Sequence, residues 1–257
     1  MPEHAPRHAP AWLTDDAPVT DEVLGLLKTG KEAEVFLVER RSLDGTRRAL
    51  LAHKRYRPTK VTRKGELEDL GFTRARTFTD DVIYHEGRRF RHSRDRRAVE
   101  RMTDYGKHLL ADRWPGQEHV LLVRIHAAGV HVPYPVAFTG DGTLMQLIGD
   151  EDGAAPRLVH ARLDRDQLVG ALDQLEEELR ALTRAGIVHA DLSPFNVLWW
   201  QDRLWLIDVP QAVDLVSNPH GFDLLHRDVV RMLEWFARQG VARDPDELFA
   251  SLLADAF

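Results

Sequence analysis

The spacing of apolar residues in the first part of the chain predicts short strands joined by a turn. Apolar and polar positions alternate over residues 28–40 and again over residues 47–56, which is typical of half-buried strands. Residues 43–46 between them suit a hairpin turn. A short helix is expected earlier, over residues 19–27, and a flexible tail over residues 1–14.

The next part of the chain predicts a helix followed by two more strands. Residues 114–128 have a helical pattern that ends at Gly129, a residue type that often closes a helix in the left-handed conformation. Strands are expected over residues 132–140 and 143–149. Residues 57–112 are rich in Arg, Asp and Glu, and we expect a long, partly helical insertion there.

The last part of the chain predicts mostly helices. A helix is expected to begin at Asp164 and end at Gly186, and two further helices are expected over residues 221–238 and 245–255. The first of these carries five leucines at the spacing of one buried stripe: Leu168, Leu172, Leu175, Leu179 and Leu182.

A polar connector separates the predicted strands of the N-terminal part from the predicted helices of the C-terminal part. Residues 149–158, GDEDGAAPRL, contain glycine and proline between apolar segments. We expect this connector to be the boundary between an N-terminal lobe of residues 15–148 and a C-terminal lobe of residues 149–257.

The composition is that of an ordinary globular protein. The chain of 257 residues is 43% hydrophobic and has a net charge of -6, which argues against bulk electrostatic binding of nucleic acid. It has no cysteine, which excludes disulfides, thiolate zinc sites and a cysteine nucleophile. No apolar run approaches the roughly 18 residues of a membrane span, and the N-terminal residues lack the apolar core of a signal peptide. The expectation is a cytoplasmic monomer without membrane contact.

Two stretches in the C-terminal half carry candidate chemistry: IVHADLSPFNVL at residues 187–198 and LWLIDVPQ at residues 204–211. If their short strands pair through a tight turn, Asp208 returns to the side of Asn196. A carboxylate and an amide carbonyl are hard oxygen ligands that suit Mg²⁺. Asp191 would lie close by and orient an attacking hydroxyl, as phosphoryl transfer from a nucleotide requires. Taken alone, Asp191 would also suit a helix or turn cap.

The N-terminal half contains a candidate phosphate-covering loop. KTGKEAEV keeps the middle glycine, Gly30, and the valine, Val35, of the protein-kinase pattern GxGxxGxV. Lys28 and Ala33 occupy the positions of the outer glycines.

A lysine and a glutamate complete the candidate nucleotide site. Lys54 falls on the next predicted strand, where it would reach the α- and β-phosphates, and Glu118 on the following helix would pair with it. Glu100 or Asp112 would serve instead if the helix register differs. Taken alone, Lys54 would be a solvated strand lysine.

In this combination of motifs the chain resembles the RIO family of atypical protein kinases, most of all its first subfamily. The matching stretches are KTGKEAEVF, AGVHVPYPV, LMQLIGDEDGAAPRL, VHADLSPFNVL, LWLIDVPQAV and SNPHGFDLLHRDV, over about residues 20–240. The resemblance implies an α+β, bilobal kinase-like fold with an N-terminal antiparallel sheet plus helix and a truncated, mostly helical C-terminal lobe. It also implies ATP with Mg²⁺ or Mn²⁺ as cofactors.

The resemblance implies a role for each matching position. The implied catalytic residues are Asp191, Lys54 and Glu118, and the implied metal ligands are Asn196 and Asp208. In some family members the aspartate that matches Asp208 accepts phosphate transiently. The implied nucleotide contacts, besides Lys54, are Gly30, Lys31 and Glu32 in the phosphate loop, Val35, Met145 at the gatekeeper position, and the backbone of Gln146 and Ile148 at the adenine.

Two motifs depart from the common protein-kinase pattern. Ala190 replaces the arginine before the catalytic aspartate, so control through a phosphorylated activation loop is not expected. Asp208-Val209-Pro210 replaces DFG, and no APE motif follows. The short remainder leaves no room for the usual peptide-binding subdomain, a truncation that RIO proteins share.

A basic run lies in the insertion: Arg88, Arg89, Arg91, Arg94, Arg96 and Arg97. It would suit contact with the backbone of ribosomal RNA. A solvated loop, in which Asp95 and Glu100 balance the charge, explains it equally well.

Three functions remain open at this point. The main interpretation is a serine/threonine kinase that transfers the γ-phosphate of ATP to an unidentified protein or to itself. The second is an ATPase switch acting on a ribosomal or other ribonucleoprotein particle. The third is a small-molecule phosphotransferase of the aminoglycoside or choline kinase kind, against which KTGKEAEV and IDVPQ weigh.

Overall fold

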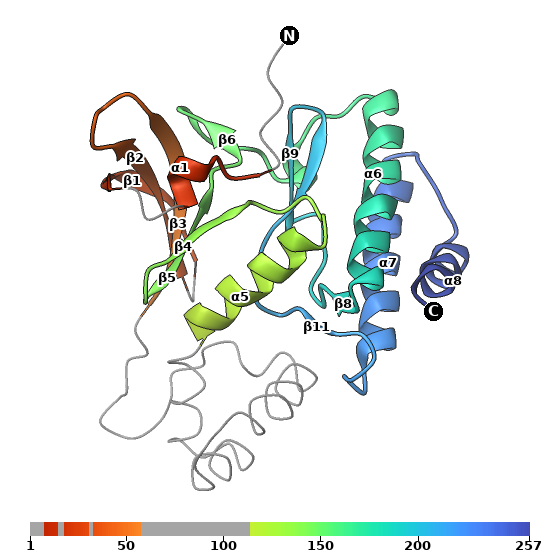
Figure 1. Ribbon diagram of the computed structural model, residues 1–257. Coiled ribbons are helices and arrows are strands. Elements are labelled where there is room, and N and C mark those ends of the chain that lie inside the picture. Colours follow the sequence, from red (N-terminus) through yellow and green to blue (C-terminus); the bar gives the residue numbers. More distant parts are fainter. Residues whose placement is uncertain (1–7, 15–17, 31–32, 58–113) are drawn as a thin grey trace, which may run out of the picture.

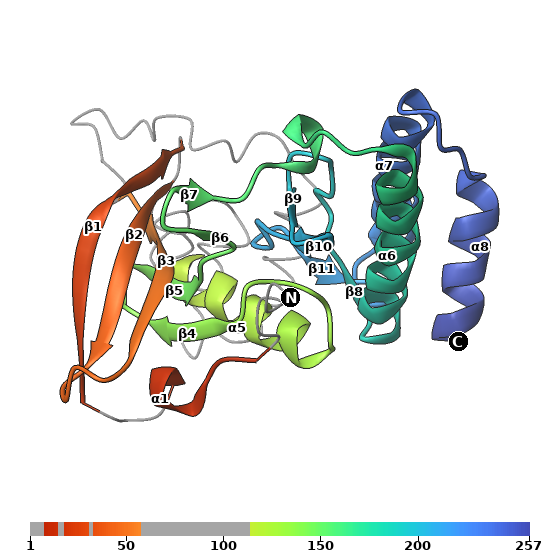
Figure 2. The ribbon, with the colours of Figure 1, turned by 90° about the horizontal axis from the view of Figure 1, so that it is seen from above.

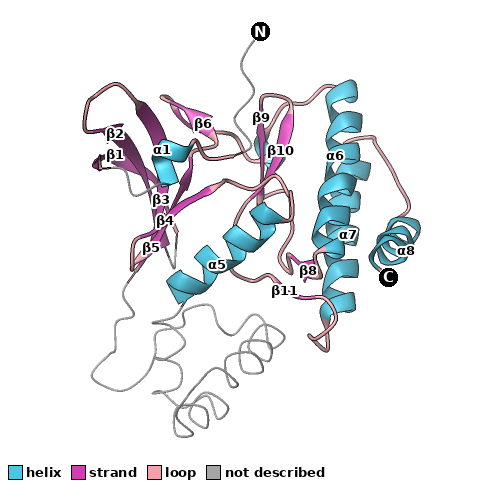
Figure 3. Ribbon diagram, in the orientation of Figure 1, coloured by secondary structure: helices cyan, strands magenta, loops and turns pink. Residues whose placement is uncertain are grey.

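The computed structural model describes residues 8–14, 18–30, 33–57 and 114–257. Within these ranges, a sheet lies at one side of the molecule and the long C-terminal helices at the other (Figure 1, Figure 3). Seen from above, several short strands lie between the two parts (Figure 2). The fold is therefore the α+β arrangement expected from the sequence.

Five strands form an antiparallel sheet in the order β1-β2-β3-β5-β4. The strands expected on either side of the hairpin turn and around residue 140 are confirmed, except that residues 28 and 29 belong to the first strand. The bounds are Val19–Thr29 for β1, Ala33–Ser42 for β2, Arg48–Tyr56 for β3, Pro135–Phe138 for β4 and Gly142–Gln146 for β5.

The expectation of a helix over residues 19–27 is wrong, because this segment is the edge strand β1. It pairs with β2 from Val19 opposite Ser42 to Thr29 opposite Glu34. A glycine inside a helix costs about 1 kcal/mol relative to alanine, and Gly25 falls in the middle of the segment. Hydrogen bonds to β2 satisfy the backbone N–H and C=O groups of this segment instead, and this tertiary pairing outweighs the local helical pattern.

The expected tail over residues 1–14 is wrong for the part that the structure describes. Ala11–Thr14 form the short helix α1, and Leu13 is 1% exposed. Leu13 packs in one cluster with Val38 of the sheet, and its carbonyl oxygen accepts a hydrogen bond from Arg40 Nη1 at 2.8 Å. Apolar burial and a hydrogen bond from a charged donor therefore hold this segment on the sheet.

Helix α5 links the sheet to the helical part of the molecule. It covers Trp114–Ala127, as expected, and the chain turns away at Gly129, whose φ of 85° is left-handed. Its side chains Leu122 and Ile125 lie in the same hydrophobic cluster as the leucines of the next long helix. One face of α5 therefore belongs to the core of the helical part.

Three long helices follow α5, as the sequence predicts: α6 over Arg165–Arg184, α7 over Gly221–Arg238 and α8 over Pro245–Ala256. Helix α6 begins with a capping box between Asp164 and Gln167, and all five leucines of its stripe are buried. No helix in the described ranges is long and apolar enough to cross a membrane.

Short strand pairs connect the two parts. Gln201 and Asp202 both have positive φ, which is typical of a two-residue hairpin turn, and they join two strands as expected. The pairs are β6 (Gly149–Asp150) with β7 (Gly153–Ala154), β8 (Ile187–Val188) with β11 (Val213–Asp214), and β9 (Val197–Trp200) with β10 (Arg203–Leu206).

The division into lobes at residues 148 and 149 stays a prediction, and residues 58–113 of the expected insertion lie outside the described residues.

Truncating Leu13 tests whether the α1 segment contributes to the folded sheet. We expect Leu13→Ala to lower the free energy of unfolding by about 2–4 kcal/mol, because a fully buried leucine leaves a cavity. Leu43→Ala is the matched control: Leu43 is 64% exposed, and its truncation should change stability by no more than about 0.5 kcal/mol. Urea unfolding followed by circular dichroism measures both. Equal losses in the two variants would contradict the docking of this segment.

Candidate active site

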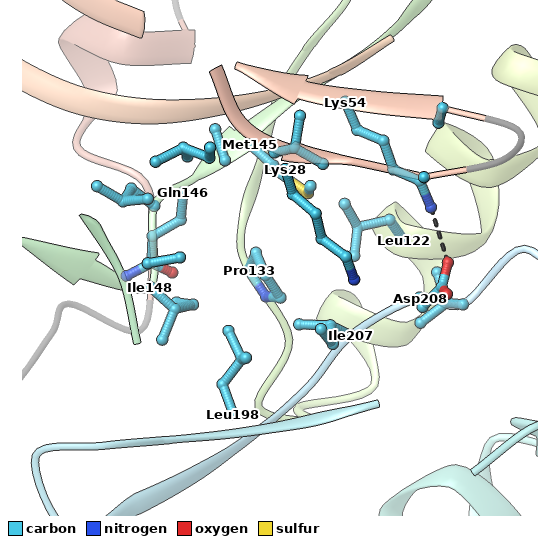
Figure 4. Close-up of a pocket in the computed structure, with 18 of the residues that line it drawn as sticks. Lys28, Lys54, Leu122, Pro133, Met145, Gln146, Ile148, Leu198, Ile207 and Asp208 are labelled. Carbon is cyan, nitrogen blue, oxygen red and sulfur yellow. Dashed lines mark hydrogen bonds and ion pairs between the residues drawn. The ribbon is translucent and has the colours of Figure 1, made fainter. Parts of the chain in front are cut away.

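A pocket of about 370 Å³ lies where the sheet meets β7, β9 and the loop after β10 (Figure 4). This volume is within the range of roughly 300–1,000 Å³ for small-molecule sites. Lys31 and Glu32 lie outside the described residues. The pocket brings together the other predicted nucleotide contacts, together with Glu118 and Asp208: Gly30, Val35, Lys54, Met145, Gln146 and Ile148.

Lys54 joins two carboxylates at one end of this pocket. Its Nζ atom lies 2.6 Å from Oε1 of Glu118 and 2.8 Å from Oδ1 of Asp208. Figure 4 shows Lys54 reaching from the sheet toward Asp208, which comes from the opposite side. Burial alone would lower the pKa of Lys54, but the two carboxylates outweigh burial and hold this pKa well above its ordinary value.

Tyr56 is a site residue that the sequence reasoning missed. Its hydroxyl donates a hydrogen bond to Oε2 of Glu118, so both carboxylate oxygens of Glu118 are engaged. Burial raises the pKa of the Tyr56 phenol, which keeps it a donor. Lys54 and Tyr56 are two residues apart on β3 and therefore face the same side, a periodicity that could have identified Tyr56 from the sequence.

Strand pairing places Asp208 beside Asn196. The N–H of Ile207 donates to the carbonyl oxygen of Asn196 at 3.0 Å, at the end of the β9–β10 ladder. Lys54 lowers the pKa of Asp208, against the opposing effect of burial, so this carboxyl is ionised near neutral pH. Asp208 has a φ of 65°, an uncommon backbone conformation for a residue with a side chain.

Asn196 also contacts the aspartate of the preceding loop. Its Nδ2 donates to the backbone oxygen of Asp191 at 2.9 Å and to Oδ2 of Asp191 at 3.2 Å. Because the amide nitrogen is turned toward Asp191, the amide oxygen remains as an acceptor. Asn196 and ionised Asp208 therefore fit the hard oxygen ligands of a divalent cation.

The described residues include no group of three or more His, Cys, Asp or Glu side chains that could hold a metal ion. Mg²⁺ often takes only one or two protein carboxylates and completes its shell with water and phosphate oxygens. A cation held by Asn196 and Asp208 would thus depend on the bound phosphates as well.

Helix α7 supports the loop that carries Asp191, which the sequence did not indicate. Nη2 of Arg227 donates to the carbonyl oxygen of Ala190, and Nη1 of Arg231 lies 3.4 Å from Oδ1 of Asp191. Asp228, 1% exposed, lies between these arginines in sequence, and burial raises its pKa to about 6. These contacts join segments about 40 residues apart, so no local motif could have shown them.

Trp199 and Trp205 are packing residues and do not line the pocket. Trp199 and Trp205 are buried, at 9% and 2% exposure, and the side chains that line the pocket from these strands are Leu198 and Ile207. The apolar wall of the pocket therefore comes from aliphatic side chains on β9 and after β10.

Comparison with known proteins gives one matching family and a set of similar proteins. A sequence model of the RIO domain matches residues 76–248. The chain is 36% identical over 169 residues to the RIO-type serine/threonine-protein kinase Rio1 of Haloferax volcanii. The matched residues make up 65% of this chain and 57% of that protein. For Rio1 of Thermoplasma acidophilum the identity is 33% over 135 residues, 52% of this chain and 69% of that protein.

A human relative extends the match at lower identity. The serine/threonine-protein kinase RIO1 of Homo sapiens is 27% identical over 226 residues, which is 87% of this chain and 35% of that protein. The chain thus spans little more than half of the Haloferax protein and about a third of the human one. Because the RIO domain model covers more than half of the chain, the chain belongs to the RIO family and is similar to its Rio1 members.

Proposed function

We propose that the chain is an atypical protein kinase that transfers the γ-phosphate of ATP to serine or threonine. The archaeal and human relatives are named serine/threonine-protein kinases. The observation that carries the proposal is the position of Lys54, whose ammonium joins β3, α5 and the loop after β10 at the end of a pocket. Such a lysine–glutamate pair beside a metal-binding aspartate is what kinase catalysis requires.

The pocket has an apolar part for a base and a charged part for phosphates. Aliphatic side chains, among them Val35, Leu198 and Ile207, line the first part. The carbonyl oxygen of Ile148 accepts a hydrogen bond from Ala155, so its N–H is the group that would meet the adenine. Lys54 has three donors, of which two point to carboxylates, and the third would bind a phosphate oxygen.

Asn196 and Asp208 would hold the divalent cation, which we propose to be Mg²⁺. A bound cation supplies positive charge that neutralises the phosphates. The chain contributes the two oxygen ligands and holds each in place, Asn196 through its bond to Asp191 and Asp208 through Lys54.

Asp191 is the proposed catalytic base. Its side chain is 43% exposed and is held from two sides, by Asn196 and by Arg231. A serine or threonine of another protein can therefore approach this carboxylate from solvent. In the proposed reaction Asp191 orients the hydroxyl group and accepts its proton.

Several finer expectations stay predictions. Contact with ribosomal RNA through residues 88–97 falls outside the described residues. The cytoplasmic location, the monomeric state and transient phosphorylation of Asp208 also stay predictions, and an ATPase switch stays the alternative to a kinase.

Replacing Asp191 tests its role as the base. We expect Asp191→Asn to lower phosphoryl transfer by about 10²- to 10⁴-fold, the usual contribution of acid–base catalysis, while ATP affinity is retained. Incubation with γ-labelled ATP, with and without a cell lysate, measures both labelled protein and free phosphate. Label on protein supports the kinase, whereas free phosphate alone would favour the ATPase switch.

The matched control for this experiment is Asp223→Asn. Asp223 is 87% exposed at the start of α7, and its change removes the same charge away from the pocket. Turnover should be unchanged in this variant. Undiminished turnover in Asp191→Asn would refute the catalytic role.

Replacing Lys54 separates its structural role from its chemical one. Lys54→Met leaves Glu118, 4% exposed, without its charge partner, and should lower the free energy of unfolding by about 3 kcal/mol. The double variant Lys54→Met/Glu118→Gln should recover at least about 1 kcal/mol, since the two changes are coupled. Phosphoryl transfer should stay low in both variants. If the single variant keeps wild-type stability and turnover, Lys54 does not belong to the site.

A further inference from the structure

Lys28 is a second lysine that points into the same pocket. It lies on β1 and lines the cavity, and Figure 4 shows its side chain extending from the strand into the open space between the labelled Pro133 and Ile207. It occupies the position of the first glycine in the kinase pattern, where no charged group is expected. The common kinase pattern therefore does not account for the positive charge of Lys28.

A β-bulge gives Lys28 its direction. Leu26 pairs with Phe36 and Lys28 pairs with Val35, so β1 has one extra residue between two consecutive residues of β2. Val35 in turn pairs with Lys54 on β3. Residues paired across a sheet project from the same face. Lys28, Val35 and Lys54 thus form one row on the pocket side of the sheet.

The two lysines of this row differ in what neutralises them. Lys54 is paired with Glu118 and Asp208. Among the residues that the structure describes, Lys28 has no carboxylate within ion-pair distance and no hydrogen bond from its amino group. Among the described residues that line the pocket, carboxylates therefore balance the charge of Lys54 but not that of Lys28.

The sequence of the phosphate-covering loop, residues 28–35, gives a reason for the positive charge of Lys28. Outer glycines allow the backbone to approach phosphates closely, and this chain has Lys28 and Ala33 in their place. A side chain at either position limits that approach. A lysine compensates, because it reaches the phosphates with a charged donor on a long stem.

We propose that Lys28 is a second phosphate-binding cation, which contacts the phosphate chain from β1 while Lys54 contacts it from β3. This inference rests on the proposed function, since it takes the ligand to be ATP. The strand spacing of about 4.8 Å places the two backbone positions roughly 10 Å apart, with the β2 strand between them. A polyphosphate lying under Val35 would meet both ammonium groups.

Calorimetric titration of the full chain tests this inference. The ligands are ATP, ADP, AMP and adenosine in excess Mg²⁺, and the variants are Lys28→Met, Lys28→Arg and Arg47→Ala. Lys28→Met should weaken ATP binding by about 10- to 100-fold, as expected for loss of a hydrogen bond between charged groups, with less than about twofold change for adenosine. Lys28→Arg should restore most of the affinity for ATP.

Arg47→Ala is the charge-matched control. Arg47 is exposed in the turn between β2 and β3, so its loss changes the net charge equally and leaves the pocket intact. Its ATP affinity should equal that of the wild type. Equal affinity of Lys28→Met and wild type for ATP would overturn the inference, and so would an equal loss for ATP and adenosine. If the wild type binds no adenine ligand, the proposed function itself falls, and the inference falls with it.

Discussion

Lys54 is shared by two carboxylates that reach it from different parts of the chain, and the geometry of the pocket depends on this sharing. Glu118 comes from α5, and Asp208 from the loop after β10. A buried pair of this kind contributes little net stability, because desolvation opposes the attraction of the charges. Separating the partners would leave a buried charge uncompensated, so the arrangement of sheet, helix and loop in which Lys54 and Tyr56 both engage Glu118 is favoured over arrangements that part them.

The loop that carries Asp191 is held by a different set of contacts. Ala190 has a φ of 63°, a conformation that costs about 1–3 kcal/mol and persists only where the surroundings impose it. Ala190 also replaces the arginine of the common kinase pattern, yet guanidinium groups still reach this loop. Arg227 and Arg231 supply them from α7, one to the Ala190 carbonyl and one to the Asp191 carboxylate. Helix α7 thus supplies guanidinium contacts to this loop from about 40 residues away along the chain.

Local patterns predicted what depends on local chemistry. The leucine stripe of α6 and the hairpin turns follow from periodicity and turn residues, whereas the expectation that Lys54 pairs with Glu118, 64 residues away, comes from the kinase pattern and the family resemblance. The segment at residues 19–27 was misjudged because its strand state depends on β2, which no local pattern shows. The direction of Lys28 depends on a bulge, and a single extra residue reverses the face that simple alternation predicts. The contacts of α7 with the loop that carries Asp191 cannot be predicted from local patterns for the same reason, since they form only in the folded chain.

We propose that Asn196 and Asp208 share a divalent cation beside a phosphate bound to Lys54. The most direct test is a crystal structure of the full chain with Mg²⁺ and a non-hydrolysable ATP analogue. We expect a metal ion at about 2.0–2.1 Å from the amide oxygen of Asn196 and from a carboxylate oxygen of Asp208, with a phosphate oxygen in contact with Lys54. A nucleotide bound outside this pocket, or a metal ion coordinated by neither residue, would contradict it.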